Sequence, residues 1–453
     1  MQVSLENMGN LERRLNVAVP LQEIDSEVEN RLKNMVRTVR LHGFRPGKVP
    51  YRIIAQQYGG QVRQEVLGDK LQRTFGDAVA EQNLRVAGPP KFEAKPVADG
   101  AQDFEYSATF EIYPEFEVGD LSNAAIRRPQ LVIGEAEIDK TIEILRKQRM
   151  HFEPVQRAAE TGDQVTVDYS GAIDGAEFEG GQGKDISVVL GEGRLLPVFE
   201  QNISGMQAGE SKTFDLDFPA DYQGKEVAGK TASFEVTLKQ VSAPKLPEVD
   251  AEFAKNLGIA DSDLDNMRAE IKLNLQREAG RRIQARIKDQ VMQALLDATS
   301  FSPPRVMVEI DAQRLKENAI RDLQTRGIKA ADLPPEALPS FDEPARRRVM
   351  LGLILAQLVK GKDLQPQPAQ VRTAVSEHAR SFEDPEQVVK WYYQSTERLR
   401  EIESLVVEDN VVAWVLGRAK VSDEPIDFDE LMGHQSAARR ESNSGEPRGQ
   451  GDA

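Results

Sequence analysis

The sequence contains no cysteine among its 453 residues, and it has only four histidines and two tryptophans. Without cysteine, the chain forms no disulfide, no thiolate metal site and no cysteine nucleophile. The N-terminus lacks a basic start followed by an apolar run, so no signal peptide is predicted. The longest apolar run, 349–359, is far shorter than the roughly 20 residues that span a bilayer. We therefore expect a cytoplasmic protein with no membrane segment.

Length and charge indicate several domains and one unusual basic stretch. At 453 residues the chain is too long for one compact core, and about three domains are expected. The 74 acidic residues outnumber the 58 basic ones, which gives a net charge of -16. Yet from Arg31 to Gln64 there is no Asp or Glu, and a positive segment of this kind predicts a strongly negative partner such as ribosomal RNA. The basic residues in it are Arg31, Lys33, Arg37, Arg40, Arg45, Lys48, Arg52 and Arg63.

Hydrophobic periodicity predicts an N-terminal segment that mixes strands and helices. Apolar residues alternate at 15–19 and 104–112, which is typical of strands with one buried face. Between them, an apolar stripe at helical spacing over 24–39 predicts a first helix. We expect a second helix that begins at Pro50 and ends at Gly59-Gly60, and a third over 62–79.

The rest of the chain changes character twice. After a helical stretch at 131–149, short alternating strands predict a small antiparallel sheet over about 152–243. Regular structure is expected to stop at 244–247, because two prolines stand close together there. Residues 248–432 have helical periodicity almost throughout, and 433–453 have hardly an apolar residue, which is typical of disorder.

The middle segment lacks the groups used in nucleophilic catalysis. Between Gly162 and Val241 there is neither histidine nor cysteine, so Ser-His and thiol mechanisms are excluded there. Aromatic residues are frequent instead, and each of them taken alone, Phe234 included, is more typical of an ordinary core than of a functional site. Taken together, four short motifs resemble the FKBP type of prolyl isomerase: Asp168-Tyr169-Ser170-Gly171, Asp174-Gly175-Ala176-Glu177-Phe178, Leu190-Gly191-Glu192-Gly193 and Phe218-Pro219-Ala220-Asp221-Tyr222.

A turn-rich octapeptide lies inside the acid-free stretch: Gly43-Phe44-Arg45-Pro46-Gly47-Lys48-Val49-Pro50. Taken alone, it is equally typical of an ordinary turn between two helices. It resembles the ribosome-docking loop of the bacterial trigger factor family, and the segments 58–69 and 429–432 resemble other parts of that family. The resemblance implies ribosome contacts through the loop, with Pro46 standing where some relatives carry lysine. The implied ribosome-binding residues are Gly43, Phe44, Arg45, Pro46, Gly47 and Lys48.

The same resemblance implies an activity and its partners. It implies an ATP-independent chaperone that holds newly synthesised proteins in an open conformation, assists folding and export, and isomerises X-Pro bonds. The implied partners are the large ribosomal subunit near the nascent-chain exit and unfolded polypeptides, with a homodimer away from the ribosome and no cofactor or metal. The implied pocket residues are Tyr169, Phe178, Leu195, Leu196, Phe199, Tyr222 and Phe234.

These expectations combine into a multidomain α+β fold. We predict a ribosome-binding α+β domain at 1–112, a linker at 113–150, and an FKBP-like antiparallel sheet domain at 151–245. An all-α chaperone domain at 246–432 and a disordered tail at 433–453 would follow.

Two other functions remain open from the residues. One is a free cytosolic prolyl isomerase whose flanking domains only recruit clients. The other is a pure RNA-binding protein, which is disfavoured because the basic stretch lacks base-stacking motifs and the remaining segments are acidic. In the helical segment, methionines on the apolar stripes are more typical of core than of a client-binding cradle.

Overall fold

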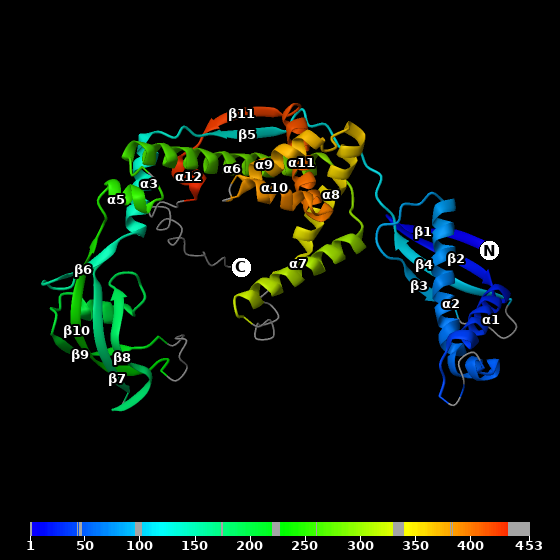
Figure 1. Ribbon diagram of the computed structural model, residues 1–453, viewed down its shortest axis with the longest axis horizontal. Coiled ribbons are helices and arrows are strands. Elements are labelled where there is room, and N and C mark those ends of the chain that lie inside the picture. The colour runs from blue at the N-terminus through cyan, green and yellow to red at the C-terminus, as the bar shows by residue number, and fades with distance from the viewer. Residues whose placement is uncertain are drawn as a thin grey trace, which may run out of the picture. The chain divides into compact units, whose positions relative to one another are not determined.

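The computed structural model describes residues 2–42, 44, 48–95, 102–173, 175–219, 227–259, 261–328, 339–380, 382 and 384–433. By its internal contacts the chain divides into two units. The first joins Met1–Arg128 to Ala285–Glu424, and the second joins Pro129–Gln284 to Pro425–Ala453. The elements of each unit are drawn in Figure 1, and they include both antiparallel sheets and long helices. The predicted multidomain α+β class is therefore confirmed.

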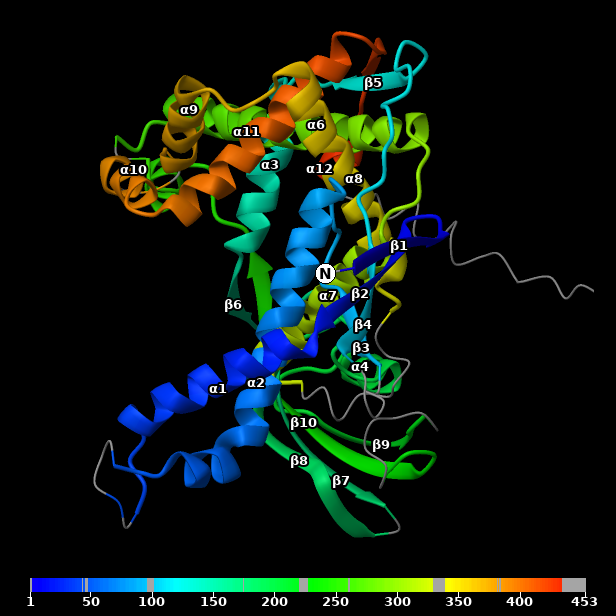
Figure 2. The same cartoon turned by 90° about the vertical axis from the view of Figure 1, so that its right-hand side faces the viewer.

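The N-terminal segment is a four-stranded antiparallel sheet that shares its core with two helices. Its strands follow the order β1-β2-β4-β3, with β1 at Gln2–Gly9, β2 at Glu12–Pro20, β3 at Lys91–Ala94 and β4 at Asp103–Glu111. The helices α1 (Leu21–Thr38) and α2 (Tyr51–Glu81) pack against each other, as Figure 2 shows in blue. The predicted alternation holds, because Leu15 and Val17 of β2 lie buried opposite Ala108 and Tyr106 of β4.

The predicted helix end at Gly59-Gly60 was wrong, because α2 is one continuous helix from Tyr51 to Glu81. A glycine inside a helix costs only about 1 kcal/mol relative to alanine. Burying one large aliphatic side chain contributes about 1.5–3 kcal/mol. Ile54, Val62 and Val66, on both sides of the glycine pair, are all 3% exposed or less. Their burial in one core outweighs the cost of the two glycines.

The middle segment is a five-stranded antiparallel sheet beside a short helix. The strand order is β6-β10-β7-β8, and β9 pairs with β10. The bounds are β6 His151–Val155, β7 Gln164–Ile173, β8 Ala176–Val189, α4 Pro197–Ile203, β9 Ser211–Asp217 and β10 Thr231–Lys245. The predicted alternation is confirmed, since Val165 and Val167 of β7 and Val236 and Leu238 of β10 are buried in one core.

Regular structure does not stop at Pro244 as predicted, because β10 continues to Lys245. In the described residues, the pairing of β10 with β7 ends at Ser242, and beyond it β10 pairs with β6. Proline is tolerated there because one side of the strand needs no N–H donor. Lys245 lies opposite His151, and its Nζ donates to the Glu153 carboxylate at 2.7 Å. The chain therefore enters this sheet on one strand and leaves it on the neighbouring strand.

The remaining described elements are mostly helices, as the sequence predicts. In the second unit, α3 (Glu135–Gln148), α5 (Ala251–Asn256) and α12 (Phe428–Met432) share a core with the first half of α6 (Leu264–Ala298). The first unit contains α7 (Arg305–Thr325), α8 (Asp342–Lys362), α9 (Pro368–Ala379), α10 (Pro385–Tyr393) and α11 (Thr396–Leu416). A two-stranded sheet pairs β5 (Ala125–Gln130) with β11 (Lys420–Pro425).

The two remaining expectations concern membrane-spanning helices and the C-terminal tail. Within the described ranges, no helix is both long enough and apolar enough to cross a membrane. Apart from Gly433, the tail predicted to be disordered lies outside the described residues.

Candidate functional site

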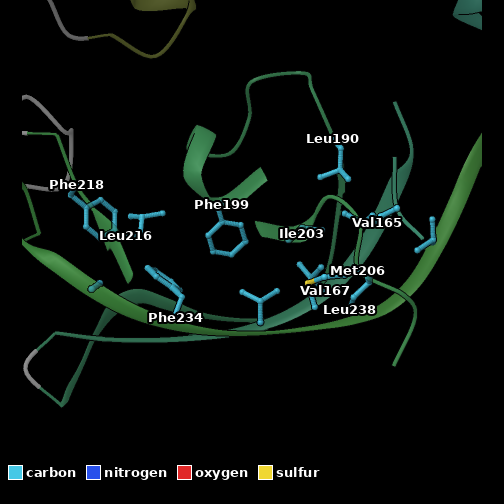
Figure 3. Packing of buried hydrophobic residues seen from close by; sticks show 14 of the residues in the cluster. Val165, Val167, Leu190, Phe199, Ile203, Met206, Leu216, Phe218, Phe234 and Leu238 are labelled. Carbon is cyan, nitrogen blue, oxygen red and sulfur yellow. The ribbon is translucent and has the colours of Figure 1, made fainter. Parts of the chain in front are cut away.

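Two buried rings, Phe199 on α4 and Phe234 on β10, lie at the centre of an aromatic cluster, which forms the floor of the predicted pocket. They are 6% and 5% exposed, and their centroids lie 5.5 Å apart with ring planes at 80°. Figure 3 shows the Phe199 ring directed from α4 toward the sheet, near Phe234. This edge-to-face arrangement is favourable because the positive edge of one ring meets the negative face of the other. The two rings thus fix each other's position without any polar contact.

Half-buried side chains surround this floor. Tyr169 on β7 lies 5.9 Å from Phe199 and 6.1 Å from Phe234, measured between ring centroids. Phe178 on β8 lies 6.1 Å from Phe234 in an edge-to-face contact. Leu195 and Leu196 pack against the same core just before α4, and the Leu196 carbonyl accepts from the Phe199 backbone N–H at 2.8 Å. The structure therefore brings six of the seven predicted pocket residues together.

The seventh predicted residue, Tyr222, lies outside the described residues. The catalytic role of all seven stays a prediction.

Glycines in β7 and β8 make room for the rings. A Cβ atom at Gly171 would lie 2.5 Å from Cε1 of Phe234, and one at Gly183 would lie 2.5 Å from Cε1 of Tyr169. Carbon atoms do not approach so closely, so any side chain at either position would displace a pocket ring. The glycine of the motif Asp168-Tyr169-Ser170-Gly171 is thus required by packing against Phe234.

Two further aromatic rings contact the rings of the predicted pocket. Phe214 on β9 lies 5.3 Å from Phe199, and Phe218 lies 6.1 Å from Phe178. The sequence prediction did not select Phe214, and it named Phe218 among the clustered aromatic residues and in a motif, but not among the pocket residues. The alternation of Phe214, Leu216 and Phe218 was the available signal, because it places all three on one face of β9 and its extension.

One charged group that adjoins a pocket residue in sequence, Asp168, is held away from the rings. Asp168 precedes Tyr169 in β7, so its side chain projects to the other face of the sheet. Its carboxylate accepts from the Asp185 backbone N–H at 2.7 Å and pairs with Lys239 at 3.2 Å. The hydrogen bond from Asp185, followed by that from Lys239, lowers the pKa of Asp168. This carboxylate therefore stays ionised on the outer face.

The pocket chemistry is that of an apolar surface. In the part of the chain that the structure describes, no group of three or more His, Asp or Glu residues is placed to hold a metal ion. Rotation about an X-Pro bond must break amide resonance across a barrier of about 18–20 kcal/mol. The charge-separated resonance form prefers water, so a dry aromatic pocket disfavours it and eases twisting. The apolar arrangement suits catalysis of a conformational change.

The predicted docking loop presents one aromatic ring to solvent. Phe44 is 38% exposed, and its backbone N–H donates to the Leu41 carbonyl at 3.1 Å. Leu41 packs against the N-terminal core on one side of the loop, and Val49 is 2% exposed on the other. The loop is therefore anchored at both ends beside an exposed ring. Gly43, Arg45, Pro46 and Gly47 lie outside the described residues, while Lys48 is described and exposed.

The structure divides the acid-free stretch into paired and unpaired cations. Arg31 contacts Glu27 at 3.2 Å and Asp69 at 2.7 Å, while Lys33 contacts Glu29 and Arg63 contacts Asp25. These carboxylates come from α1 and α2 outside the stretch, and they cancel part of its charge. The cations that have no ion-pair partner among the described residues are Arg37, Arg40, Lys48 and Arg52, all exposed. The uncompensated positive charge is thus concentrated at the loop and the helix ends that flank it.

Comparisons with known proteins give the same assignment over nearly the whole chain. The family model described as bacterial trigger factor protein matches residues 1–145, and the one described as the trigger factor C-terminus matches 263–417. A model of FKBP-type peptidyl-prolyl cis-trans isomerases matches residues 155–239, which contain the aromatic pocket.

Curated relatives extend this match across the chain. The trigger factor of Nitrosospira multiformis is 55% identical over 436 residues, covering 96% of this chain and 100% of the relative. That of Nitrosomonas europaea is 52% identical over 439 residues, covering 96% and 99%. That of Aromatoleum aromaticum is 50% identical over 436 residues, covering 96% and 100%. The chain belongs to the trigger factor family, the ribosome-associated chaperones that carry an FKBP-type prolyl isomerase domain.

Proposed function

We propose that the loop Gly43–Lys48 docks on the large ribosomal subunit beside the nascent-chain exit. The observation that carries this proposal is the exposed Phe44 ring among Arg37, Arg40, Lys48 and Arg52, which are exposed and have no carboxylate partner in the described residues. Cations of this kind bind phosphate oxygens and release counterions, so the affinity falls with salt. Arg45 adds a further positive charge to the loop.

The docking proposal is tested by a triple variant of the full chain, Phe44→Ala with Arg45→Ala and Lys48→Ala. Co-sedimentation with ribosomes should be lost while isomerase activity stays within about twofold of the parent. The matched control is Arg31→Ala with Lys33→Ala, which removes two cations that already have carboxylate partners. Ribosome pelleting by the triple variant equal to that of the parent would refute the assignment.

In the same proposal, the prolyl isomerase reaction takes place in the aromatic pocket. Phe199 and Phe234 receive the prolyl ring, and Tyr169 and Phe178 exclude water from the amide. A hydrogen bond from the Tyr222 hydroxyl or from a backbone N–H would stabilise the twisted carbonyl or the prolyl nitrogen. The complete pocket set is Tyr169, Phe178, Leu195, Leu196, Phe199, Tyr222 and Phe234.

The proposed division of labour follows the predicted domains. Residues 1–112 dock, 113–150 link, 151–245 isomerise, and the helical domain at 246–432 binds exposed apolar segments of unfolded polypeptides without ATP. Tail residues 433–453 have no assigned role. We place the protein in the cytoplasm, partly bound to ribosomes, with a homodimer as its form away from them.

The alternative is a free cytosolic prolyl isomerase whose other domains only recruit clients. The Phe178→Ala variant separates the two functions, because Phe178 is half-buried and belongs to the pocket. If the variant loses isomerase activity but still protects an unfolded client from aggregation, the chaperone function is independent. Loss of both activities in a folded variant would favour the alternative.

A further inference from the structure

One carboxylate in the isomerase segment is almost completely buried and belongs to no pocket wall. Asp163, immediately before β7, is 1% exposed. The Arg157 guanidinium donates to its two carboxylate oxygens at 2.6 and 2.9 Å, and the Glu160 backbone N–H donates at 2.9 Å. This forked pair satisfies both oxygens, which a buried charge requires. The pair closes a tight turn over residues 157–163.

The backbone of this turn holds the start of a second segment, residues 190–206. The Gly162 N–H donates to the Leu190 carbonyl at 2.8 Å, and the Leu190 N–H donates to the Asp163 carbonyl at 2.9 Å. Leu190 is 3% exposed, so these bonds are made inside the core.

The same turn also holds the end of that segment. The Ala159 N–H donates to the Met206 carbonyl at 2.9 Å, and the Gly205 N–H donates to the Ala159 carbonyl at 2.8 Å. Ala159 and Met206 are both core residues. Leu190 and Met206, both labelled in Figure 3, come before and after α4, the helix that carries Phe199, in the chain. Both ends of residues 190–206 are therefore hydrogen-bonded to the same turn, and we call these residues the suspended segment.

The suspended segment supplies one side of the pocket, namely Leu195, Leu196 and Phe199. The opposite side comes from strands β7, β8 and β10 of the sheet. We propose that Asp163 is a positioning residue for prolyl isomerisation, which together with Arg157 sets the distance between these two sides. The proposal rests on the pocket assigned above, and it adds a residue that touches no substrate.

The test uses the full chain with the variants Asp163→Asn and Arg157→Lys. Asparagine keeps the shape and one oxygen for the Glu160 N–H, but it removes the charge that holds the guanidinium. Lysine keeps the charge but cannot form the fork. The matched control is Glu192→Gln, which removes an exposed carboxylate from the suspended segment itself, where it pairs with Arg194 at 3.3 Å. Each protein is assayed with two proline tetrapeptides, one with leucine and one with glutamate before the proline.

We expect kcat/KM for the Leu-Pro peptide to fall by about tenfold to a hundredfold in both variants, because small displacements of positioning groups have effects of this size. The preference for Leu-Pro over Glu-Pro should fall as well, since the displaced wall is apolar. A smaller folded fraction would instead lower both rates equally and leave the ratio unchanged. Hydrogen exchange should show faster exchange in 190–206 and unchanged protection in β9 and β10.

Three outcomes would overturn the proposal. The first is activity within about twofold of the parent and of Glu192→Gln in both variants. The second is an unchanged Leu-Pro to Glu-Pro ratio. The third is an equal loss of protection throughout β7, β9 and β10 in both variants, which would mean that the pair only supports the fold. If the parent protein itself does not isomerise the peptides, the pocket assignment fails rather than the role of Asp163.

Discussion

Phe234 and Phe44 are both phenylalanines in predicted functional regions, yet the first is 5% exposed and the second is 38% exposed. Phe234 contacts the rings of Tyr169, Phe178 and Phe199 in a fixed arrangement. Phe44 stands in an anchored loop, next to cations without carboxylate partners among the described residues. The six described pocket side chains pack together within the folded chain, whereas the loop leaves an aromatic ring exposed and several cations without a carboxylate partner among the described residues.

This difference in burial and in contacts indicates how each of the two regions can be identified. A pocket that eases twisting of an amide must be preorganised and dry, so its residues contact one another before any substrate arrives. A docking loop needs the opposite, because charges already neutralised inside the protein add little to binding. Burial therefore identifies the first kind of region, and missing partners identify the second.

The largest expected effect comes from the same substitution made in both regions. Phe199→Ala should destabilise the isomerase segment by about 3–5 kcal/mol, which is typical for deletion of a buried aromatic ring. Phe44→Ala should change stability by less than about 0.5 kcal/mol, since an exposed ring is removed. Denaturant unfolding, isomerase assays and ribosome pelleting would measure both variants. Loss of ribosome binding in Phe199→Ala, or of isomerase activity in Phe44→Ala, would break the separation of the two regions.

A pair of glycine substitutions tests the difference in packing between the isomerase pocket and the N-terminal segment. Gly171→Ala would place a Cβ 2.5 Å from the Phe234 ring, so we expect about 1–3 kcal/mol of destabilisation and lower isomerase activity. Gly60→Ala lies on an open surface inside α2, with no other atom within 4 Å of the added Cβ. It should stabilise the N-terminal segment by up to about 1 kcal/mol. Thermal unfolding of both variants is the measurement, and the unfolding temperature should fall for Gly171→Ala and rise for Gly60→Ala.

The basic stretch from Arg31 to Gln64 can be divided in the same way by its charges. Arg40→Ala removes an exposed cation with no carboxylate partner in the described residues, whereas Arg31→Ala removes one that contacts Asp69 at 2.7 Å. Ribosome binding measured at several salt concentrations should show a salt slope smaller by about 1 for Arg40→Ala. The slope of Arg31→Ala should equal that of the parent. Equal losses in the two variants would contradict the division of the basic stretch.

The smallest expected effect is a pH dependence on the outer face of the isomerase sheet. Hydrogen bonds from Asp185 and Lys239 lower the pKa of Asp168 in the folded protein. The ionised group therefore stabilises the fold above the pKa of an unfolded aspartate, about 3.9. This stabilisation is lost as pH falls through the lower folded value. Asp168→Asn should unfold at a slightly lower temperature than the parent at pH 7, and the difference should disappear once the pH lies below the folded pKa of Asp168.

Local pattern predicted the elements well where periodicity dominates. The strands around Val165 and Val236 and the helices of the C-terminal half are found where the apolar spacing indicates. The two local errors, at Gly59-Gly60 and at Pro244, have a common cause. In both places a residue that disfavours regular structure is tolerated because of tertiary context, a shared core in one case and a one-sided strand in the other.

The sites were predictable to different extents. The FKBP-like motifs pointed to Tyr169, Phe178, Leu195, Leu196, Phe199 and Phe234, and packing brings these side chains together. The carboxylate partners of the basic stretch were not predictable from its composition. Asp69 reaches Arg31 from 38 positions away, and only the packing of α1 against α2 creates that contact. The role of Asp163 was also not predictable from the sequence. It depends on backbone hydrogen bonds between the turn at 157–163 and both ends of residues 190–206.

The pairing of β6 with the end of β10 has a consequence for how the chain can be rebuilt. His151 and Lys245 face each other across neighbouring strands, which lie about 5 Å apart in any sheet. Excising everything between them would leave two chain ends that a few residues can join. Conversely, a foreign domain with adjacent termini can be inserted at the same point. The isomerase segment is thus attached to the rest of the chain through two neighbouring strands, and it can be removed or replaced at one place.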